Sequence, residues 1–433
     1  MVAAVLFIVF AVLLFIGTPI AVCLGASSVL AMIVQGAGRP LDTIMSSLPR
    51  LVSSSTSKFV LLAIPFFILA GNIMEKAGIS GKLIRLAEVC VGHLRGGLAI
   101  VCVIVSCFFA AISGSGPATV AALGLIMIPA MIKAGYKPAF AAALMGTSGA
   151  IGVVIPPSIT FVVYGSIADA SIGTLFLAGV LPGLLMGAGL MITALLIGNR
   201  SKLETMPKAS GKERWEAFKD AFWGLLMPVI ILGGIYGGIF TPTEAAAVSV
   251  VYGLFVGAFI YKQIRLKELY ELLLDSVSTT ATVMFITAAA SLFAYVLTRA
   301  RLDVAISTAL EHVTGGSAVV FFMIVNIILL IAGCFLDSTS ALYIFTPLFV
   351  PVASALGIDL IHLGVVMIVN LAIGLFTPPV GVNLYVACGV ANVNLKEISR
   401  AVLPLMAASI IVLLIVTYAR QTHECISQSN PYY

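Results

Sequence analysis

The sequence predicts an all-α polytopic membrane protein built from two inverted-topology repeats, and three observations support this class. The 433 residues are 61% hydrophobic and 9% charged, so the chain has too few polar residues to cover a water-soluble surface. Its second half repeats features of its first half at a nearly constant offset. Each half also carries a Pro-Pro pair inside an apolar segment, where a transmembrane helix must break.

The internal repeat is seen in matched residues. Pro156-Pro157 recurs as Pro378-Pro379, and the same offset of 222 residues pairs Gly152 with Gly374. Each half is expected to make about five crossings plus one re-entrant helical hairpin. Because this number of crossings is odd, the second half is expected to be inverted relative to the first. Broken helices in corresponding positions of two halves indicate a secondary transporter's binding site near the membrane midplane.

The first repeat is expected to occupy residues 1–198. Residues 1–36 form its first hydrophobic span, interrupted at Gly17-Thr18-Pro19, and a second span follows at about 59–74. Residues 75–95 place charged residues among leucines and isoleucines at helical spacing, which predicts an amphipathic arm helix in the membrane interface.

The re-entrant hairpin is expected in the segment that starts at residue 97. Its small-residue run at Ser113-Gly114-Ser115 is followed by an apolar stretch to Pro129 that is too short to cross the bilayer easily. The broken helix begins at Pro138, and a last span runs from about 174 to 198.

A charged linker is expected at residues 199–220, before a second repeat at 221–420 and a C-terminal tail at 421–433. If this linker is cytoplasmic and the N-terminus periplasmic, most basic residues between the spans fall inside, as the positive-inside rule requires. Residues 76–95 fall on the outside in this arrangement and are its exception.

Two cation sites are expected where each hairpin tip lies opposite a broken helix. Na⁺ prefers several oxygen ligands, and a broken helix exposes carbonyl oxygens without adding charge to the membrane. The first set is Ser113 and Ser115 with carbonyls of Gly152, Ile155 and Pro157; the second is Asp337 and Thr339 with Gly374, Thr377 and Pro379. The alternative is that such Gly- and Ser-rich stretches serve close helix packing.

Substrate-binding candidates are the polar residues just past each break, Ser158, Thr160 and Asn383, because helix N-termini favour anions. Hydrogen bonding between helices is the alternative role for them. Arg299, at the end of an apolar span, could attract a carboxylate, although a snorkelling interfacial arginine is more common. Glu244 follows Thr241 in the spacing of a helix capping box, which explains it without a functional role.

Enzymatic and nucleic-acid functions find no support in the sequence. It has no P-loop and no H-E-x-x-H motif, so ATP is not expected to drive this chain and it is not expected to be an enzyme. The basic residues are spread between apolar segments rather than clustered, which argues against nucleic-acid binding.

Four separated motifs resemble the large membrane subunit of tripartite ATP-independent periplasmic (TRAP) transporters. They are Ile64-Pro65-Phe66-Phe67-Ile68-Leu69-Ala70-Gly71-Asn72, Ser113-Gly114-Ser115, Phe240-Thr241-Pro242-Thr243-Glu244-Ala245-Ala246 and Asn370-Leu371-Ala372-Ile373-Gly374-Leu375-Phe376-Thr377-Pro378-Pro379. The resemblance implies Na⁺-driven import of an organic acid across the bacterial inner membrane, with sialic acid favoured over a C4-dicarboxylate. It also implies a periplasmic substrate-binding protein and a small four-helix membrane subunit, expected here as a separate chain because Met1 starts directly in the large subunit.

The resemblance further implies an elevator-type ion-transporter fold. The scaffold would then comprise residues 1–74 and 221–298, and the moving transport parts would comprise 97–198 and 299–420. Two other functions remain open at this point: a stand-alone Na⁺/carboxylate symporter that needs no binding protein, and a membrane scaffold or channel without coupled transport.

Overall fold

The computed structural model describes residues 1–198 and 206–419, and these residues form helices and connecting loops without a β-strand. The predicted tail at 421–433 and positions 199–205 of the predicted linker lie outside the described residues. Within the described ranges, eight helices are long and apolar enough to cross a membrane, or nine if one bent pair counts as a single span. The all-α polytopic class is confirmed.

The helices of the first half are α1 (Val2–Phe15), α2 (Ile20–Gln35), α3 (Leu41–Met45), α4 (Leu48–Thr56), η1 (Phe59–Leu62), α5 (Ala63–Lys76), α6 (Ile79–Val91), α7 (Gly97–Ser113), α8 (Gly116–Lys133), α9 (Pro138–Val154), α10 (Ile159–Ala168) and α11 (Ile172–Gly198). Those of the second half are α12 (Gly211–Tyr236), α13 (Pro242–Phe255), η2 (Val256–Ile260), α14 (Leu266–Arg299), α15 (Leu302–Thr314), α16 (Ala318–Gly333), α17 (Ser338–Ala355), α18 (Leu360–Gly374), α19 (Val382–Ala391) and α20 (Leu395–Tyr418).

The order of elements follows the sequence repeat. α17 starts at Ser338 and α18 at Leu360, each 222 residues after the start of α8 at Gly116 and of α9 at Pro138. Both Pro-Pro breaks separate helices as predicted, α9 from α10 and α18 from α19. The inversion of the second half within a membrane stays a prediction.

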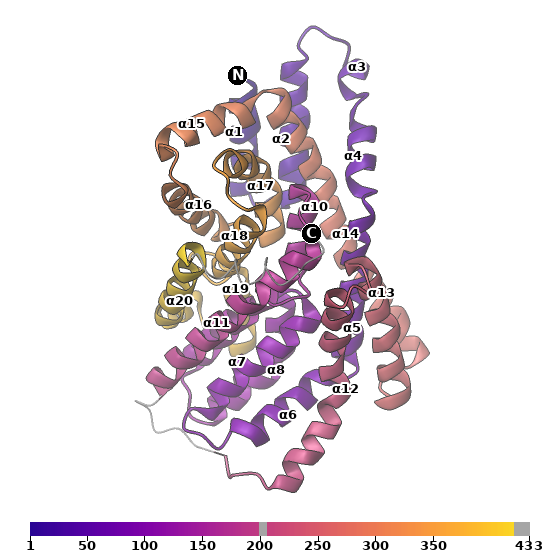
Figure 1. Cartoon of the computed structure of the whole chain (residues 1–433), viewed down its shortest axis with the longest axis vertical. Helices are drawn as coiled ribbons and strands as arrows, with labels where there is room; N and C mark the ends of the chain where they lie inside the picture. Colours follow the sequence, from indigo (N-terminus) through magenta and orange to yellow (C-terminus); the bar gives the residue numbers. More distant parts are fainter. Residues whose placement is uncertain (199–205, 420–433) are drawn as a thin grey trace.

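The first 36 residues differ from the single interrupted span that was expected. They form two helices, α1 and α2, joined at Gly17, whose positive φ of 85° ends α1. The two helices pack against each other and lie side by side (Figure 1). Gly-Thr-Pro therefore reverses the chain here rather than bending one helix, because Pro19 cannot continue α1.

The segment predicted to be re-entrant forms a hairpin of two helices, α7 and α8, and α8 is long and apolar enough to cross a membrane. A Cβ atom added to Gly96, just before α7, would lie 3.7 Å from the hydroxyl oxygen of Tyr136, just after α8. The start of α7 and the end of α8 thus share one end of the molecule, and the turn lies at Gly114-Ser115, where the sequence predicted it. Whether the hairpin re-enters or crosses a membrane stays a prediction.

Within the predicted arm segment 75–95 the structure has the helix α6, which buries Ile79, Leu83 and Ile84 and packs on α12. Its position in the membrane interface stays a prediction. The prediction that this segment and the linker lie at opposite ends of the molecule is wrong. Arg85 Nη1 lies 3.3 Å from Asp220 Oδ2, and Arg214 Nε donates to the carbonyl of Val89 at 3.2 Å. The arm and the end of the linker therefore occupy the same end of the molecule, opposite the N-terminus (Figure 1).

The predicted linker at 199–220 is also partly helical. Ser210 and Glu213 form a capping box that starts α12 at Gly211. The second capping box, formed by Thr241 and Glu244 at the start of α13, confirms the structural role predicted for Glu244.

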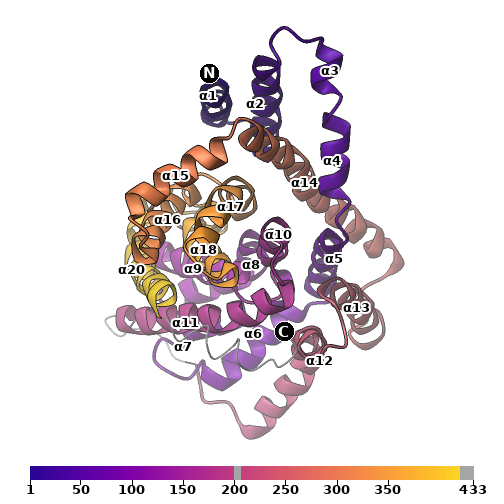
Figure 2. The same cartoon turned by 45° about the horizontal axis from the view of Figure 1, so that its top comes forward.

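Two groups of helices define the architecture. Helices α7–α11 and α15–α20 gather in one bundle, and α1–α5 with α12–α14 line one side of it (Figure 2). The boundary between the groups runs along α5 and α14, which contact α7 and α17 of the bundle. The candidate site lies at this boundary.

Candidate functional site

The first hairpin tip packs directly on the first helix break. Gly114 adopts a left-handed conformation with φ 62° and ends α7, and a Cβ at this position would lie 3.1 Å from the carbonyl oxygen of Pro157. A Cβ at Gly152 would lie 3.1 Å from the carbonyl oxygen of Ser115. The residues predicted for the first cation site are therefore brought together, and only glycine allows these backbones to approach so closely.

The first break uses its own hydroxyl groups to satisfy a free carbonyl. Ser158 Oγ and Thr160 Oγ1 donate to the carbonyl of Val153 at 2.6 and 3.0 Å. Ser158 is 1% exposed and Thr160 is 4% exposed. Of these two predicted substrate residues, only Thr160 lines the cavity between the tips. Ser158 thus has a structural role at the break.

The second tip is organised by Asp337. Its carboxylate caps the N-terminus of α17, accepting hydrogen bonds from the backbone N–H of Ser340 at 3.1 Å and from the Ser340 hydroxyl. At the facing break, a Cβ added to Gly374 would lie 2.6 Å from the Cα of Gly333 on α16. Helices α16 and α18 therefore cross in backbone contact at the site predicted for the second cation.

The remaining predicted ligands are less enclosed. Thr377 Oγ1 donates to the carbonyl of Ile373 at 2.7 Å, and Pro379 is exposed. Neither residue lines the cavity between the tips, whereas Thr339 does.

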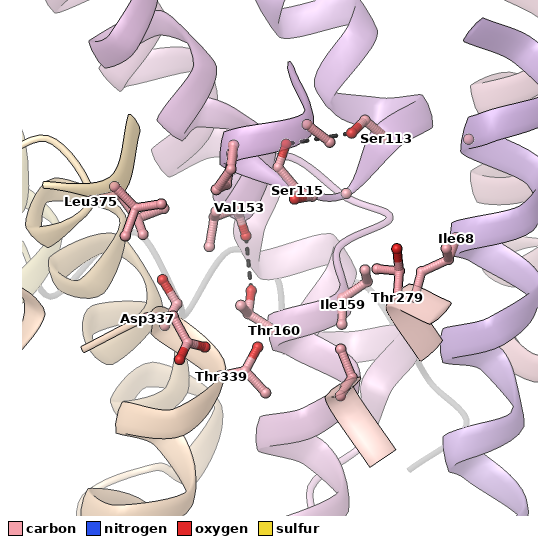
Figure 3. Close-up of a pocket in the computed structure, with 18 of the residues that line it drawn as sticks. Ile68, Ser113, Ser115, Val153, Ile159, Thr160, Thr279, Asp337, Thr339 and Leu375 are labelled. Atoms are coloured by element: carbon pink, nitrogen blue, oxygen red, sulfur yellow. Dashed lines mark hydrogen bonds between the residues drawn. The ribbon is translucent and has the colours of Figure 1, made fainter. Parts of the chain in front are cut away.

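One cavity of about 230 Å³ joins both tips and both breaks, and Figure 3 shows Thr160, Asp337 and Thr339 around it. Its wall is completed by α5 and α14. The lining residues are Ile68, Gly71, Asn72, Glu75, Ser113, Gly114, Ser115, Gly116, Pro117, Ala118, Val153, Ile159, Thr160, Thr279, Val283, Asp337, Ser338, Thr339, Leu375 and Val382.

The residues contributed by α5 and α14 were not predicted. Asn72 Nδ2 donates to Ser276 Oγ at 2.8 Å and ties α5 to α14, while Glu75 and Thr279 face the cavity. The signal that could have found them is the occurrence of Asn72 and Glu75 three positions apart in an apolar span, which places both on one helix face.

Asn383 and Arg299 lie outside this cavity. Asn383 is fully buried and donates to the carbonyl of Gly146 at 2.9 Å, beside Gly116, so it links the two halves. Arg299 is exposed at the end of α14, donates to the Tyr295 hydroxyl and lines a different cavity with Arg39. The structure does not bring Arg299 to the hairpin tips.

The cavity is chemically suited to a hard cation. Its wall carries two carboxylates, Glu75 and Asp337, with hydroxyls and exposed backbone, and its lining residues include no lysine, arginine, histidine or cysteine. Oxygen donors without imidazole or thiolate favour alkali or alkaline-earth ions over transition metals.

Comparison with known proteins decides the family. Residues 7–422 match the family model for the tripartite ATP-independent periplasmic transporter, DctM component. The chain belongs to the DctM family. A C4-dicarboxylate TRAP transporter large permease protein from Pseudomonas aeruginosa is 47% identical to it over 87% of this chain and 88% of that protein. A sialic acid TRAP transporter large permease protein from Vibrio cholerae is 41% identical over 83% of this chain and 84% of its own length.

The fold of this DctM-family chain is similar to that of the YdaH transporter of Alcanivorax borkumensis, with a TM-score of 0.65 over 93% of this chain and 98% of the other. The sequence identity is 12%, so this likeness concerns the fold alone. The relatives are transporter permeases, and the chain is a multi-pass membrane transporter subunit of this family.

Proposed function

We propose that this chain is the large permease subunit of a Na⁺-coupled secondary importer of organic acids in the bacterial cytoplasmic membrane. The observation that supports it best is the acidic cavity lined by both hairpin tips and both breaks. Discontinuous helices near the midplane supply carbonyl oxygens to coupling ions and N–H groups to substrate anions. Membership of a tripartite periplasmic family supports two partners: a periplasmic substrate-binding protein and a small membrane subunit.

Two Na⁺ ions are proposed as the cofactors, one at each tip. The first would bind the hydroxyls of Ser113 and Ser115 and carbonyls at the first break. The second would bind Asp337 and Thr339 with carbonyls of the second break, near Gly374. Asp337 carries the only carboxylate at either tip, and a carboxylate ligand offsets much of the charge of the cation.

The proposed orientation has a cytoplasmic linker and a periplasmic N-terminus. The basic residues in and just before α6 and α12 share the linker end of the molecule, and positively charged segments favour the cytoplasmic side. These residues are Lys76, Lys82, Arg85, Lys208, Lys212, Arg214 and Lys219. The arm helix therefore lies at the linker end and agrees with this orientation, whereas Arg39, between α2 and α3, lies at the N-terminal end and is an exception to it (Figure 1).

For the substrate, an organic acid is the proposed class. The sequence resemblance favours sialic acid, whereas the 47% identity to a C4-dicarboxylate permease exceeds the 41% identity to a sialic acid permease. We therefore propose a C4-dicarboxylate as the first substrate to test, and sialic acid as the second. The ligand that copurifies with the binding protein encoded beside this chain distinguishes them.

The test is uptake into proteoliposomes that contain both membrane subunits, with loaded binding protein outside. Uptake is expected only with an inward Na⁺ gradient and with all three components. Uptake without the binding protein and small subunit would instead identify a stand-alone symporter. Flux that is independent of Na⁺ and unchanged by Asp337→Ala would identify a channel.

A further inference from the structure

A second cavity lies next to the first along the same three helices. It measures about 410 Å³ and is lined by residues of α4, η1, α10, α14 and α17 and by Lys58, which lies between α4 and η1. On α14 the lining residues continue from Thr279 and Val283 in the first cavity to Thr287 and Ala294 in the second, all on one helix face. We call this second cavity the vestibule.

The same continuity holds on α17 and α10. Thr339 lines the first cavity and Tyr343, one turn later, lines the vestibule. Thr160 at the start of α10 faces the first cavity, and Ser166 near its end faces the vestibule. Between the two cavities, the Tyr343 hydroxyl donates to Thr287 Oγ1 at 2.8 Å and joins α17 to α14.

The two cavities carry opposite charge. Glu75 and Asp337 line the first, which has no basic lining residue, whereas Lys58 lines the vestibule, which has no acidic lining residue. The carboxylate of Asp169 lies 3.9 Å from Lys58 Nζ, but its side chain is 92% exposed, so water screens this ion pair strongly. The Lys58 side chain is 47% exposed and remains reachable from solvent.

The vestibule also offers hydrogen-bond donors for a carboxylate. Lys58 Nζ donates to the carbonyl of Ser166 at 2.5 Å, which leaves two further N–H groups on the ammonium. Thr346 is fully buried, lines the vestibule, and its hydroxyl has no hydrogen-bond partner among the described residues. An ammonium and a hydroxyl that line one cavity are both able to donate to a carboxylate.

We propose that the vestibule is a binding site for the organic anion, separate from the cation-binding cavity, with Lys58 as its charged ligand and Thr346 as its second donor. This inference rests on the proposed function as an organic-acid permease. The anion is held one helical turn from the first cavity, on the far side of the Tyr343–Thr287 hydrogen bond.

The test measures the charge preference of each cavity by thiol labelling in membrane vesicles, without a Na⁺ gradient or uptake. Ser291→Cys reports on the vestibule and Thr279→Cys on the first cavity, with native cysteine labelling subtracted. The anionic reagent methanethiosulfonate ethylsulfonate should react faster than its trimethylammonium analogue at Ser291→Cys, and slower at Thr279→Cys. Cavity walls of low dielectric constant that bear one charge enrich the opposite ion by about tenfold or more.

Lys58→Gln should lower the anionic-to-cationic rate ratio at Ser291→Cys about tenfold. Lys58→Arg should leave this rate ratio unchanged. Lys396 is exposed, and Lys396→Gln is the matched control, which removes the same charge elsewhere and should also leave the ratio unchanged. Succinate should slow the anionic reagent at Ser291→Cys, and less so after Thr346→Val. Equal ratios at the two cysteines, or a ratio that Lys58→Gln leaves unchanged, would overturn the proposal. A failure of Na⁺-coupled uptake would leave these labelling ratios intact, so the two proposals fail separately.

Discussion

Replacing Asp337 by asparagine separates the two roles of this carboxylate. As a helix cap it accepts hydrogen bonds from the backbone and the hydroxyl of Ser340. Asparagine caps helices about as well as aspartate, so Asp337→Asn should change the free energy of unfolding by only about 0.5 kcal/mol. The variant loses the negative charge in the cavity, and a charge-assisted interaction contributes about 1.5–3 kcal/mol, or roughly a 10- to 100-fold change in affinity.

The assay is thermal unfolding of the purified protein in detergent, titrated with NaCl at constant ionic strength set by choline chloride. Na⁺ that binds the folded state raises the Tm, and the half-maximal concentration should rise about 10- to 100-fold in Asp337→Asn. Asp337→Ala should show the same loss of Na⁺ affinity and a further destabilisation of about 1 kcal/mol from the lost cap. An unchanged Na⁺ midpoint in Asp337→Asn would refute the ligand role.

Three further variants test the packing around the site, each measured by thermal unfolding. Gly374→Ala should lower the free energy of unfolding by about 1–3 kcal/mol, because the added carbon meets the backbone of Gly333. Gly389→Ala is the control, because nothing lies within 4 Å of the added carbon, and it should leave the free energy of unfolding unchanged. Equal effects of the two variants would contradict the close backbone crossing of α16 and α18. A double-mutant cycle of Arg85→Ala and Asp220→Ala should give a coupling energy below about 1 kcal/mol, because the two side chains are 57% and 48% exposed. A coupling of several kcal/mol would contradict this exposure. Asn383→Ala should cost about 1–3 kcal/mol because a buried carbonyl on α9 loses its donor; a neutral result would mean that water replaces the amide.

Much of the fold could be predicted because the repeat has a nearly constant register. Proline pairs and glycine positions are local signals, and they located both breaks and the first hairpin tip to within a few residues. The packing of that tip on the facing break followed from the same reasoning, because only small residues let Gly114 and Gly152 approach another backbone so closely.

The parts that were missed depend on tertiary contacts or on a local signal that was overlooked. Apolar residues 1–36 fit either one bent span or two packed helices, and composition does not choose between them. The side of the arm helix is set by contacts such as Arg85 with Asp220, which sequence spacing does not show. In contrast, the Ser210 and Glu213 capping box was readable and would have shortened the predicted linker.

The role of a residue at the site also required the structure. Ser158 and Thr160 have similar sequence positions past the break, yet only Thr160 faces the cavity. Glu75 comes from α5, more than 250 residues before Asp337, and the two line one cavity because α5 and α17 both border it.

The most direct test of the central claim is the ion dependence of uptake by the reconstituted three-component system. With loaded binding protein outside, a NaCl gradient directed inward should drive accumulation of the organic acid above equilibrium, and an equal KCl or choline chloride gradient should not. Accumulation that is as fast under the KCl gradient as under the NaCl gradient would contradict Na⁺ coupling through the cavity between the two hairpin tips.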